Sequence, residues 1–481
     1  MERLTPLLVV TIVVAAGSTF MAEHIGSLYD DAYIYFRYAD NLVAGCGFRF
    51  NCGAEPVEGF TSPLFLLLVT CVRALTADLE WGVSLLGAGL LMGMLGLCAA
   101  LPRGLLTGRS AAVASVLAAL VLAADDHVLA TGPSGMETSL GIAAVAGLWL
   151  ATLKRAPLAT GLLLPLALLS RPETGVFLVV LLLPWARTSR CLVPAGLGLA
   201  AVGLWRLVVF GEVVPNTFAA KSGGTALHLE QGLSYVTEAF VQYPLALLAP
   251  LALLAGRRRE LAALGLASMV WVAFVVRAGG DHFSYSRLLA PVLVPASVLA
   301  VVGVTELAAS RGRLWFAGLP LLPFAAWTHT AKDLAPEHGF ANVAQWVDVG
   351  RWIAAERPGS TAATVPIGAI GWFCECELID LVGLTEPAIA RAGRTVPPEM
   401  FVRQWIGHER HNTEYVLSRE PDLIVTNKWR LEPWTLEESR AGFYASWLLL
   451  QEVKAGRAPY HVLNAQVAEG VYWLMLERDL H

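Results

Sequence analysis

The chain is organised around the stretch from Tyr29 to Pro63, which reads YDDAYIYFRYADNLVAGCGFRFNCGAEPVEGFTSP. It follows the first long apolar run, opens with the adjacent carboxylates Asp30 and Asp31, and interleaves further charges with aromatic side chains. The whole chain is 56% hydrophobic and only 15% charged, so this density of acidic residues in one loop is unusual. Because carboxylates beside hydrocarbon are costly and are kept for function, we interpret the stretch as the active site.

The composition is that of a protein that crosses a membrane many times. Apolar runs fill the first 330 of the 481 residues, and the mean hydropathy is +0.58, as in polytopic membrane proteins. The net charge of -5 and the lack of a basic patch give no sign of nucleic acid binding. The lipid bilayer is therefore the first expected partner.

Apolar segments that predict membrane helices lie at 6–22, 62–76, 82–101, 111–124, 138–153, 158–170, 175–186, 191–210, 244–256, 261–276, 288–309 and 314–328. Basic residues fall in the short loops at every second turn, and the positive-inside rule makes these loops cytoplasmic. These residues are Arg103 and Arg109, Lys154 and Arg155, Arg187 and Arg190, Arg257 to Arg259, and Arg311 and Arg313.

The remaining loops then face outward, namely the first outer loop 23–61 and the loops 125–137, 171–174, 211–243 and 277–287. Segments 62–76 and 82–101 cannot both span if Arg103 lies inside, so we expect about eleven spans and one re-entrant or tilted segment. The run Leu7–Phe20 has a weak basic flank and no clean cleavage site, which predicts a retained helix rather than a signal peptide.

The composition changes after Thr328, where charges and tryptophans become frequent. We predict a helix at 342–357 and strands at 362–373, 377–382, 422–425 and 467–476, which together make a soluble α/β domain. The expected organisation is a membrane module at 1–330 and a C-terminal α/β domain at 331–481 on the outer face.

The polar clusters that have chemical character all fall on the predicted outer side. A carboxylate at the outer end of the first helix is partly desolvated, which raises its pKa toward neutrality and suits a general base that activates a hydroxyl. Adjacent helical residues point about 100° apart, so one of Asp30 and Asp31 can face the reaction while the other meets Arg37 or solvent. The plainer alternative is that both carboxylates only mark the membrane boundary.

Cationic side chains on the same side could neutralise a phosphate: Lys221, Arg287, Arg171 and His282. The alternatives are an arginine that reaches lipid headgroups, and a salt bridge between Arg287 and Asp281. Nucleotide sugars are not found outside the cell, so a phosphate leaving group there has to be carried by a lipid. Its departure from a sugar passes through an oxocarbenium-like state that nearby cations stabilise.

The chain resembles membrane glycosyltransferases of the GT-C superfamily, and most closely the bacterial arabinofuranosyltransferase-like group. The resemblance rests on stretches in the same order over nearly the whole chain: DDAYIYFRYADNLVAG, GFRFN, VEGFTSP, SGMET, RPE, VVPNTFAAKSG, GGDHFSYSRLLAP, LIDLVGLTEP, IGHER and EPDLIV. It implies a GT-C fold and an inverting transfer of a sugar, such as the pentose arabinofuranose, from a polyprenyl-phosphate donor. The acceptor would be a hydroxyl of a glycan or glycoprotein outside the plasma (inner) membrane of a bacterium.

The resemblance also implies roles for individual residues. It places the general base on Asp30 or Asp31, with Asp30 expected as the base and Asp31 assisting, and it implies donor or acceptor contacts for Glu58, Lys221, Asp281 and Arg287. Donor phosphate contacts are expected at Lys221, Arg287, Arg171 and His282. The expected substrate contacts are Tyr33, Arg37, Glu58, Glu137, Asn216, Asp281 and, from the tail, His408, for which a solvent position is an equal alternative.

Cysteines and metal ligands leave questions open at this stage. Cys46 and Cys52 stand where the family has other residues, which predicts a disulfide that closes the first outer loop. Cys374 and Cys376 are either a second disulfide in an oxidising compartment or free thiols. No metal is assigned, although Asp30 and Asp31 could coordinate a divalent ion as in some GT-C enzymes.

Two other classes of function remain. A transporter or flippase for a lipid-linked sugar would use the carboxylates for binding, but such proteins usually have repeated halves, which this sequence lacks. A non-catalytic scaffold whose tail binds a glycan is the third hypothesis.

Overall fold

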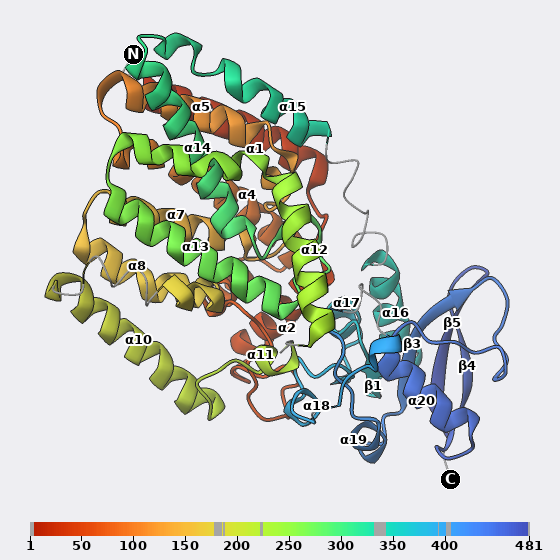
Figure 1. Ribbon diagram of the computed structural model, residues 1–481. Coiled ribbons are helices and arrows are strands. Elements are labelled where there is room, and N and C mark those ends of the chain that lie inside the picture. Colours follow the sequence, from red (N-terminus) through yellow and green to blue (C-terminus); the bar gives the residue numbers. More distant parts are fainter. Residues whose placement is uncertain are drawn as a thin grey trace.

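The structure is a computed structural model that describes residues 4–177, 185, 188–221, 225–330, 343–392, 394–400 and 406–479. Figure 1 shows a bundle of long helices, which carries the N-terminus, and a smaller part with a β-sheet, which carries the C-terminus. The expected boundary between 330 and 331 falls at the edge of 331–342, which lies outside the described residues.

The helix bundle is the membrane part. Its principal helices are α1 (Thr5–His24), α4 (Leu79–Ala100), α5 (Gly108–Ala123), α7 (Thr138–Leu153), α8 (Pro157–Ser170), α10 (Ser189–Phe210), α13 (Arg258–Ala278) and α14 (Ala290–Ser310). Two further elements, α12 (Ala226–Gln242) and the 3-10 helix η3 (Pro244–Ala255), bend by 72° at their junction. Helix α14 lies deepest, with 78% of its most apolar window buried. The short α15 (Leu322–Thr330) ends the bundle.

The number of spans does not reach the expected eleven. Within the described residues, five helices are long and apolar enough to cross a membrane, or six if α12 and η3 form one broken span. Helices α5, α7 and α8 have 14–16 residues, which is at most about 24 Å, against a hydrocarbon core of about 30 Å. The expected segment 175–186 lies partly outside the described residues. The chain is a multi-pass membrane protein whose exact span count stays a prediction.

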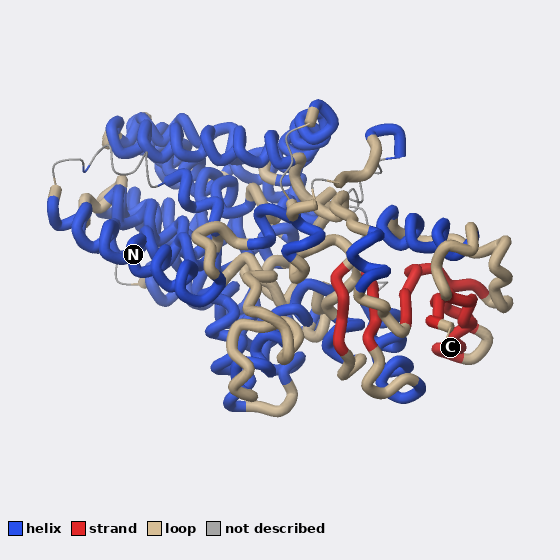
Figure 2. Tube along the Cα trace, turned by 90° about the horizontal axis from the view of Figure 1, so that it is seen from below, coloured by secondary structure: helices blue, strands red, loops and turns tan. Residues whose placement is uncertain are grey.

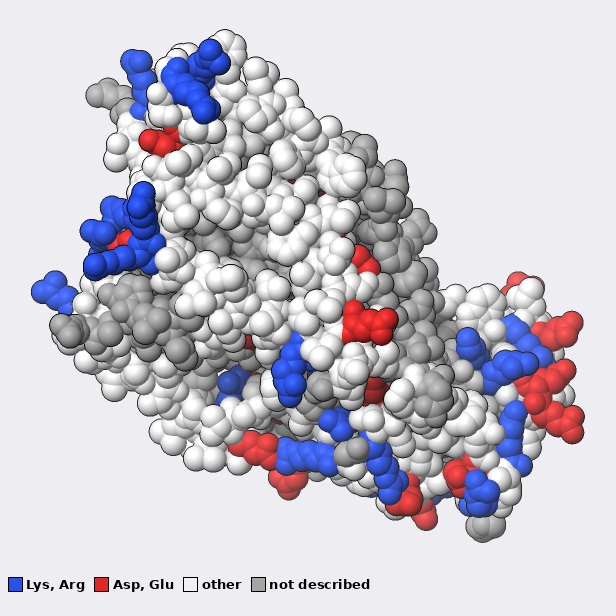
Figure 3. Space-filling view, in the orientation of Figure 1, with Lys and Arg blue, Asp and Glu red and all other residues white. Residues whose placement is uncertain are grey.

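Many basic residues of the bundle gather at one end, as the predicted membrane orientation requires. On the face in Figure 3, Lys and Arg gather at the end of the bundle remote from the sheet, and a belt without charges separates them from the mixed charges of the tail. Basic residues adjoin helix ends at this pole, including Arg155 just after α7 and Arg311 just after α14. This is the pole that the predicted orientation places in the cytoplasm, and the orientation itself stays a prediction.

The first outer loop folds into a short helix that lies on the opposite end of the bundle. Helix α2 (Asp30–Val43) buries most of its first three turns, including Tyr33, Phe36 and Tyr38. Helix α3 (Pro63–Leu75) begins where the Ser62 hydroxyl accepts the Phe65 N–H at 3.2 Å, with a proline at its first position. With 13 residues, α3 is too short to span the membrane. This length agrees with the prediction of one re-entrant or tilted segment. A disulfide joins Cys46 to Cys52, as predicted.

The tail contains a five-stranded sheet in the order β2-β1-β3-β5-β4. Strand β1 (Thr361–Thr364) is parallel to β2 (Glu377–Asp380) and to β3 (Leu423–Arg430), whereas β5 (Val471–Arg478) is antiparallel to β3 and to β4 (Tyr460–Ala468). The helices are α16 (Val343–Glu356), α17 (Ala369–Phe373), α18 (Pro387–Ala390), α19 (Thr413–Ser418) and α20 (Tyr444–Lys454).

Two of the predicted strands in the tail were wrong. Residues 362–373 do not form one strand, because β1 ends at Thr364 and α17 follows. Residues 467–476 contain the turn between β4 and β5, where Gly470 has a φ of +69° that suits glycine. Both errors arose because an apolar run does not reveal where the chain reverses. The predicted helix at 342–357 corresponds to α16.

The tail and the first outer loop share one hydrophobic core. Buried side chains of α2, such as Tyr33 and Phe36, belong to the same cluster as Ile367 and Ile370 of the tail. A separate cluster fills the membrane helices. Figure 2, seen from below the first view, shows the sheet beside the bundle with loops between them. The tail is therefore packed through α2 against the end of the bundle at which the polar loops converge.

Candidate active site

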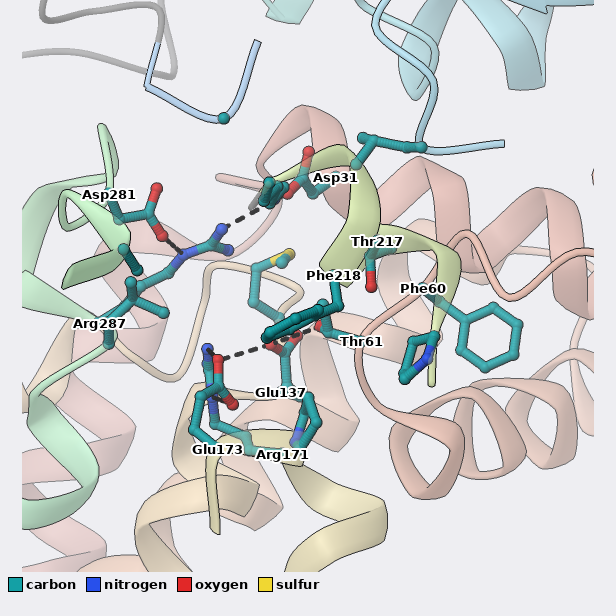
Figure 4. Close-up of a pocket in the computed structure, with 18 of the residues that line it drawn as sticks. Asp31, Phe60, Thr61, Glu137, Arg171, Glu173, Thr217, Phe218, Asp281 and Arg287 are labelled. Carbon is teal, nitrogen blue, oxygen red and sulfur yellow. Dashed lines mark hydrogen bonds and ion pairs between the residues drawn. The ribbon is translucent and has the colours of Figure 1, made fainter. Parts of the chain in front are cut away.

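A cavity of about 510 Å³ lies where the first outer loop, the ends of several membrane helices and the tail meet. It is lined by charged residues from separate elements (Figure 4) and by apolar residues that include some of α13 and of the tail. Six residues that the sequence predicted to be functional line it: Asp31, Glu137, Arg171, Lys221, Asp281 and Arg287. They are up to 256 positions apart in the chain, from 31 to 287, so the fold has brought them together.

Arg287 lies between two carboxylates on one side of the cavity. Its Nε donates to the Asp281 carboxylate at 2.6 Å, and its Nη2 lies 3.6 Å from the Asp31 carboxylate (Figure 4). Burial acts to raise the pKa of Asp281, but the positive charges of Arg287, His282 and Lys221 outweigh it and hold that pKa below its usual range. Asp281 and Arg287 thus form an ionised pair, which confirms the salt bridge between them. The Nη2 atom of Arg287 lies toward Asp31 instead.

Arg171 occupies the opposite wall with two more carboxylates. Its guanidinium is 3.1 Å from Glu137 and 3.2 Å from Glu173, and all three side chains are nearly buried. Thr61 donates to Glu137 at 3.2 Å, and the Tyr35 hydroxyl is 3.3 Å from the same carboxylate. A buried network of this kind offers several fixed donors and acceptors to a hydroxyl-rich ligand.

The cavity also contains cations that are not held in a buried ion pair. Lys221 lies just after the short helix α11 (Asn216–Ala220), and Arg277 lies in the last turn of α13, where it is exposed. Neither takes part in an ion pair among the described residues. Phe274, one turn before Arg277, supplies an apolar surface beside it. This edge of the cavity therefore combines positive charge with apolar side chains at the end of a membrane helix.

Two histidines meet edge to face beside the cavity, one from each part of the protein. The rings of His282 and His408 are 4.9 Å apart, so His408 of the tail does reach this region, although neither histidine lines the cavity itself. Burial lowers the pKa of His408 to about 3, and the neighbouring His282 and Lys221 act in the same direction. Burial likewise lowers the pKa of His282. The His408 ring is therefore neutral near pH 7.

Asp30 faces the tail rather than the cavity. Its two carboxylate oxygens accept the backbone N–H groups of Ala369 at 2.7 Å and Gly368 at 3.2 Å. Burial raises the pKa of Asp30 to about 7, against the lowering effect of these hydrogen bonds. Its pKa is thus shifted as expected for a general base, but both of its oxygens are used in the contact with the tail. Asp31 lines the cavity, and Asp30 does not.

Four further residues that the sequence predicted to contact the substrate lie outside the cavity. Their polar groups bond to other parts of the protein instead. Tyr33 donates to Glu80 at 2.5 Å, and Glu58 forms a buried pair with Arg206 of α10. The Asn216 side chain donates to two carbonyl groups of the tail, those of Gly383 and Leu384, both at 2.8 Å. Arg37 donates to backbone carbonyls of the first outer loop and of the tail.

Some lining residues were missed or undervalued in the sequence. Glu173 was quoted within RPE without a role of its own, and Arg277 was placed at the start of the outer loop 277–287 without a role. Ile406 and Gly407 of the tail close the cavity, with Gly407 packed beside the Lys221 stem. The signal for Arg277 was its place at the outer end of a predicted helix, next to the quoted motif at 279–291.

The described residues contain no group of three or more His, Cys, Asp or Glu side chains that could hold a metal ion. Asp30 and Asp31 point to different partners, the tail backbone and Arg287. The two carboxylates are thus not arranged as a shared site. The structure also pairs Cys374 with Cys376 in a disulfide, which answers the question left open by the sequence.

Comparisons with known proteins agree with this architecture. The chain is 27% identical to a terminal β-(1→2)-arabinofuranosyltransferase of Corynebacterium glutamicum over 399 residues, which cover 68% of this chain and 54% of that relative. The chain therefore spans about half the length of the curated relative that it matches. Residues 337–468 match a family described as a domain of unknown function (DUF8728).

Solved structures share the fold. ArnT from Cupriavidus metallidurans bound to undecaprenyl phosphate superposes with a TM-score of 0.56 at 12% identity, covering 97% of both chains. AglB from Archaeoglobus fulgidus, in complex with an inhibitory peptide and a dolichol-phosphate, has a TM-score of 0.51 at 13% identity over 79% of this chain and 64% of that one. At such low identity these likenesses establish the fold alone, and it is the fold that the resemblance to the GT-C group implies.

Proposed function

We propose that this protein is an inverting glycosyltransferase that moves a sugar from a polyprenyl-phosphate donor to a hydroxyl of a glycan or glycoprotein acceptor. The observation that carries the proposal is the cavity in which Asp31 lies beside Arg287, with Lys221 and Arg277 at its edge. The names of the similar proteins support the class, since one is an arabinofuranosyltransferase and one was solved with undecaprenyl phosphate.

The donor phosphate fits the edge formed by Lys221 and Arg277. A lipid-linked phosphate needs positive charge for its head and apolar surface for its tail, and Phe274 and Arg277 provide both on α13. Arg171 and Arg287, which the sequence also predicted to bind phosphate, are already neutralised by buried carboxylates. Their role is to hold Glu137, Glu173 and Asp31 in place, with one edge of Arg287 left for the developing phosphate charge.

Asp31 is the residue that the geometry favours as general base. Its carboxylate lines the cavity and keeps a free edge, whereas Asp30 is bound to the tail backbone. Asp31 would accept the proton of the acceptor hydroxyl as that oxygen bonds to the anomeric carbon. The bond from that carbon to the phosphate oxygen breaks, and the polyprenyl phosphate leaves with the electron pair, so the configuration inverts. The assignment of the base therefore moves from Asp30 to its neighbour.

The sugar is a pentose, with D-arabinofuranose as the first choice because of the named relative. Its hydroxyls would meet the network of Glu137, Arg171 and Glu173 on the far wall. The protein would lie in the plasma (inner) membrane of a bacterium, with the cavity and the tail outside, where lipid-linked donors are used. The basic pole of the bundle supports this orientation.

The test is a transfer assay with purified protein, synthetic polyprenyl-phosphate arabinofuranose and an arabinofuranose disaccharide acceptor. Asp31→Asn should lower kcat by at least about 100-fold, the usual contribution of a general base, while the donor still binds. Asp30→Asn should retain much of the activity, because Asp30 does not line the cavity.

The opposite ranking of the two variants would return the base to Asp30. No transfer by wild type with any pentose donor, together with unaltered donor binding by both variants, would contradict the enzyme proposal and favour a carrier for lipid-linked sugars.

A further inference from the structure

A second cavity, of about 840 Å³, lies between the first outer loop and the tail. One wall consists of residues 51–57 and one side of α2, and the other consists of residues of 371–377 and 385–388 with Tyr415 and Arg419. Its volume is in the upper part of the 300–1,000 Å³ range of ligand pockets. None of its lining residues lines the candidate active site.

The two cavities lie on either side of one contact. A Cβ atom at Gly59 would come within 2.6 Å of the Thr385 side chain, so the loop backbone touches the tail there. Gly59 and Leu384 face the candidate active site, whereas Val57 and Thr385 line the second cavity. A ligand in the second cavity would therefore be separated from the candidate active site by only one or two residues of the loop and of the tail.

The walls of the second cavity are preformed. Arg37 crosses from loop to tail by donating to the Phe50 carbonyl at 2.8 Å and to the Cys376 carbonyl at 2.7 Å. Each wall contains one of the two disulfides, and one cysteine of each, Cys52 and Cys376, lines the cavity. A rigid site of this kind binds without a large loss of conformational entropy.

Two carboxylates of the cavity are held in place by hydrogen bonds and can accept further hydrogen bonds from a ligand. Asp40 accepts the Trp372 indole N–H at 2.7 Å on one oxygen and an Arg73 N–H on the other, and Glu386 accepts the Tyr415 hydroxyl at 2.7 Å. Each carboxylate has about four lone-pair positions, so these contacts leave room for a ligand. Glu375 is exposed and takes part in no ion pair within the described ranges, and the same is true of Glu55 on the facing wall.

The chemistry of the lining selects the class of ligand. Carboxylates outnumber the two arginines, so a polyanion such as a phosphorylated polymer would be repelled. The rings of Trp372 and Tyr415 stand among these acceptors. Sugar rings match this combination, because they present C–H faces to aromatic groups and hydroxyl edges to fixed acceptors.

We infer that the second cavity binds a neutral oligosaccharide, the part of the acceptor glycan that lies away from the reacting hydroxyl. Its identity as acceptor rests on the proposed function, whereas glycan binding does not. The tail would thereby hold a growing chain next to the catalytic cavity and make long acceptors better substrates than short ones.

The experiment measures binding of linear arabinofuranose and mannose hexasaccharides to the full-length protein in nanodiscs by calorimetry. The Asp31→Asn background keeps catalysis out of the measurement. The double variant Glu55→Ala/Glu375→Ala should weaken binding of at least one hexasaccharide about tenfold, the combined loss of two hydrogen-bonding groups. The matched control Glu469→Ala removes an exposed carboxylate from the turn between β4 and β5, outside both cavities, and should change nothing.

A second variant, Glu55→Gln/Glu375→Gln, separates two occupants. A neutral glycan should keep most of its affinity, because an amide still forms hydrogen bonds, whereas a cationic peptide would lose it. With wild-type catalysis restored, the Ala double variant should raise KM about tenfold for a hexasaccharide acceptor and leave a disaccharide acceptor unchanged.

Three results would overturn the inference: no binding of either hexasaccharide by wild type, equal binding by the Ala double variant, or equal loss in the Ala and Gln double variants. Binding that depends on Glu55 and Glu375 without any sugar transfer would support the glycan site and contradict the proposed function instead.

Discussion

Asp30 and Asp31 are adjacent in sequence but have different environments. The backbone N–H groups of Gly368 and Ala369 hold Asp30, whereas Asp31 lies beside Arg287 at the wall of the cavity. Adjacent residues at the start of a helix diverge by about 100°, so one element can supply both a joint to the tail and a group for chemistry. We therefore expect the two aspartates to differ in what they control, stability for Asp30 and catalysis for Asp31.

The pKa of Asp30 leads to a prediction for stability against pH. Burial raises this pKa from 3.8 to about 7, so between about pH 4 and 7 the folded protein holds a proton that the unfolded chain has lost. Stability should then fall as the pH rises through this window. Asp30→Asn cannot titrate and should show a flatter slope of melting temperature against pH, measured by differential scanning fluorimetry. Parallel slopes for the two proteins would contradict a raised pKa for Asp30.

Among the elements, the first outer loop is anchored to the bundle by a buried ion pair. Glu58 and Arg206 of α10 are 2% and 5% exposed, and the guanidinium makes contacts of 2.9–3.2 Å with the carboxylate. The pair fixes the segment that carries Gly59, Phe60 and Thr61 into the cavity. Its function is thus positional, in place of the substrate contact that the sequence predicted for Glu58.

Removing one partner of this pair should be strongly destabilising. Arg206→Met leaves the Glu58 carboxylate buried without its partner, which costs about 3–5 kcal/mol in comparable cases. The double variant Glu58→Leu/Arg206→Met should recover most of the loss, because no isolated charge remains. Thermal unfolding in detergent measures both, and Arg457→Ala at an exposed pair of the tail serves as the control. Equal destabilisation by the single and double variants would contradict the argument.

At the scale of the whole molecule, the membrane orientation is the main prediction. Basic residues collect at the pole remote from the tail, and the cavity opens at the other pole. In cells that carry Glu469→Cys, an impermeant maleimide should label the tail without lysis, whereas Arg311→Cys should react only after lysis. Both variants need the Cys71→Ser background, since Cys71 is an exposed free thiol. The reverse pattern would place the tail in the cytoplasm.

The sequence predicted the membrane bundle, the α/β tail and most of the charged residues that line the cavity. It did so because hydropathy and charge are local properties, and because outward loops of a bundle meet at one pole whatever the helix packing. Arg171, Lys221, Asp281 and Arg287 could be named from this reasoning, and all four line the cavity. Periodicity could not locate the reversal at Gly470 or the short helix after Thr364, because both interrupt apolar runs.

The sequence by itself determined which residue types face outward and that carboxylates open the first outer loop. Only the tertiary structure decided which of them serve chemistry. Asp30 is bound by tail amides more than 330 positions away, and Glu58 is neutralised by an arginine in a membrane helix. A side chain's role depends on its partners in space, and such partners come from packing between elements, which no local pattern records.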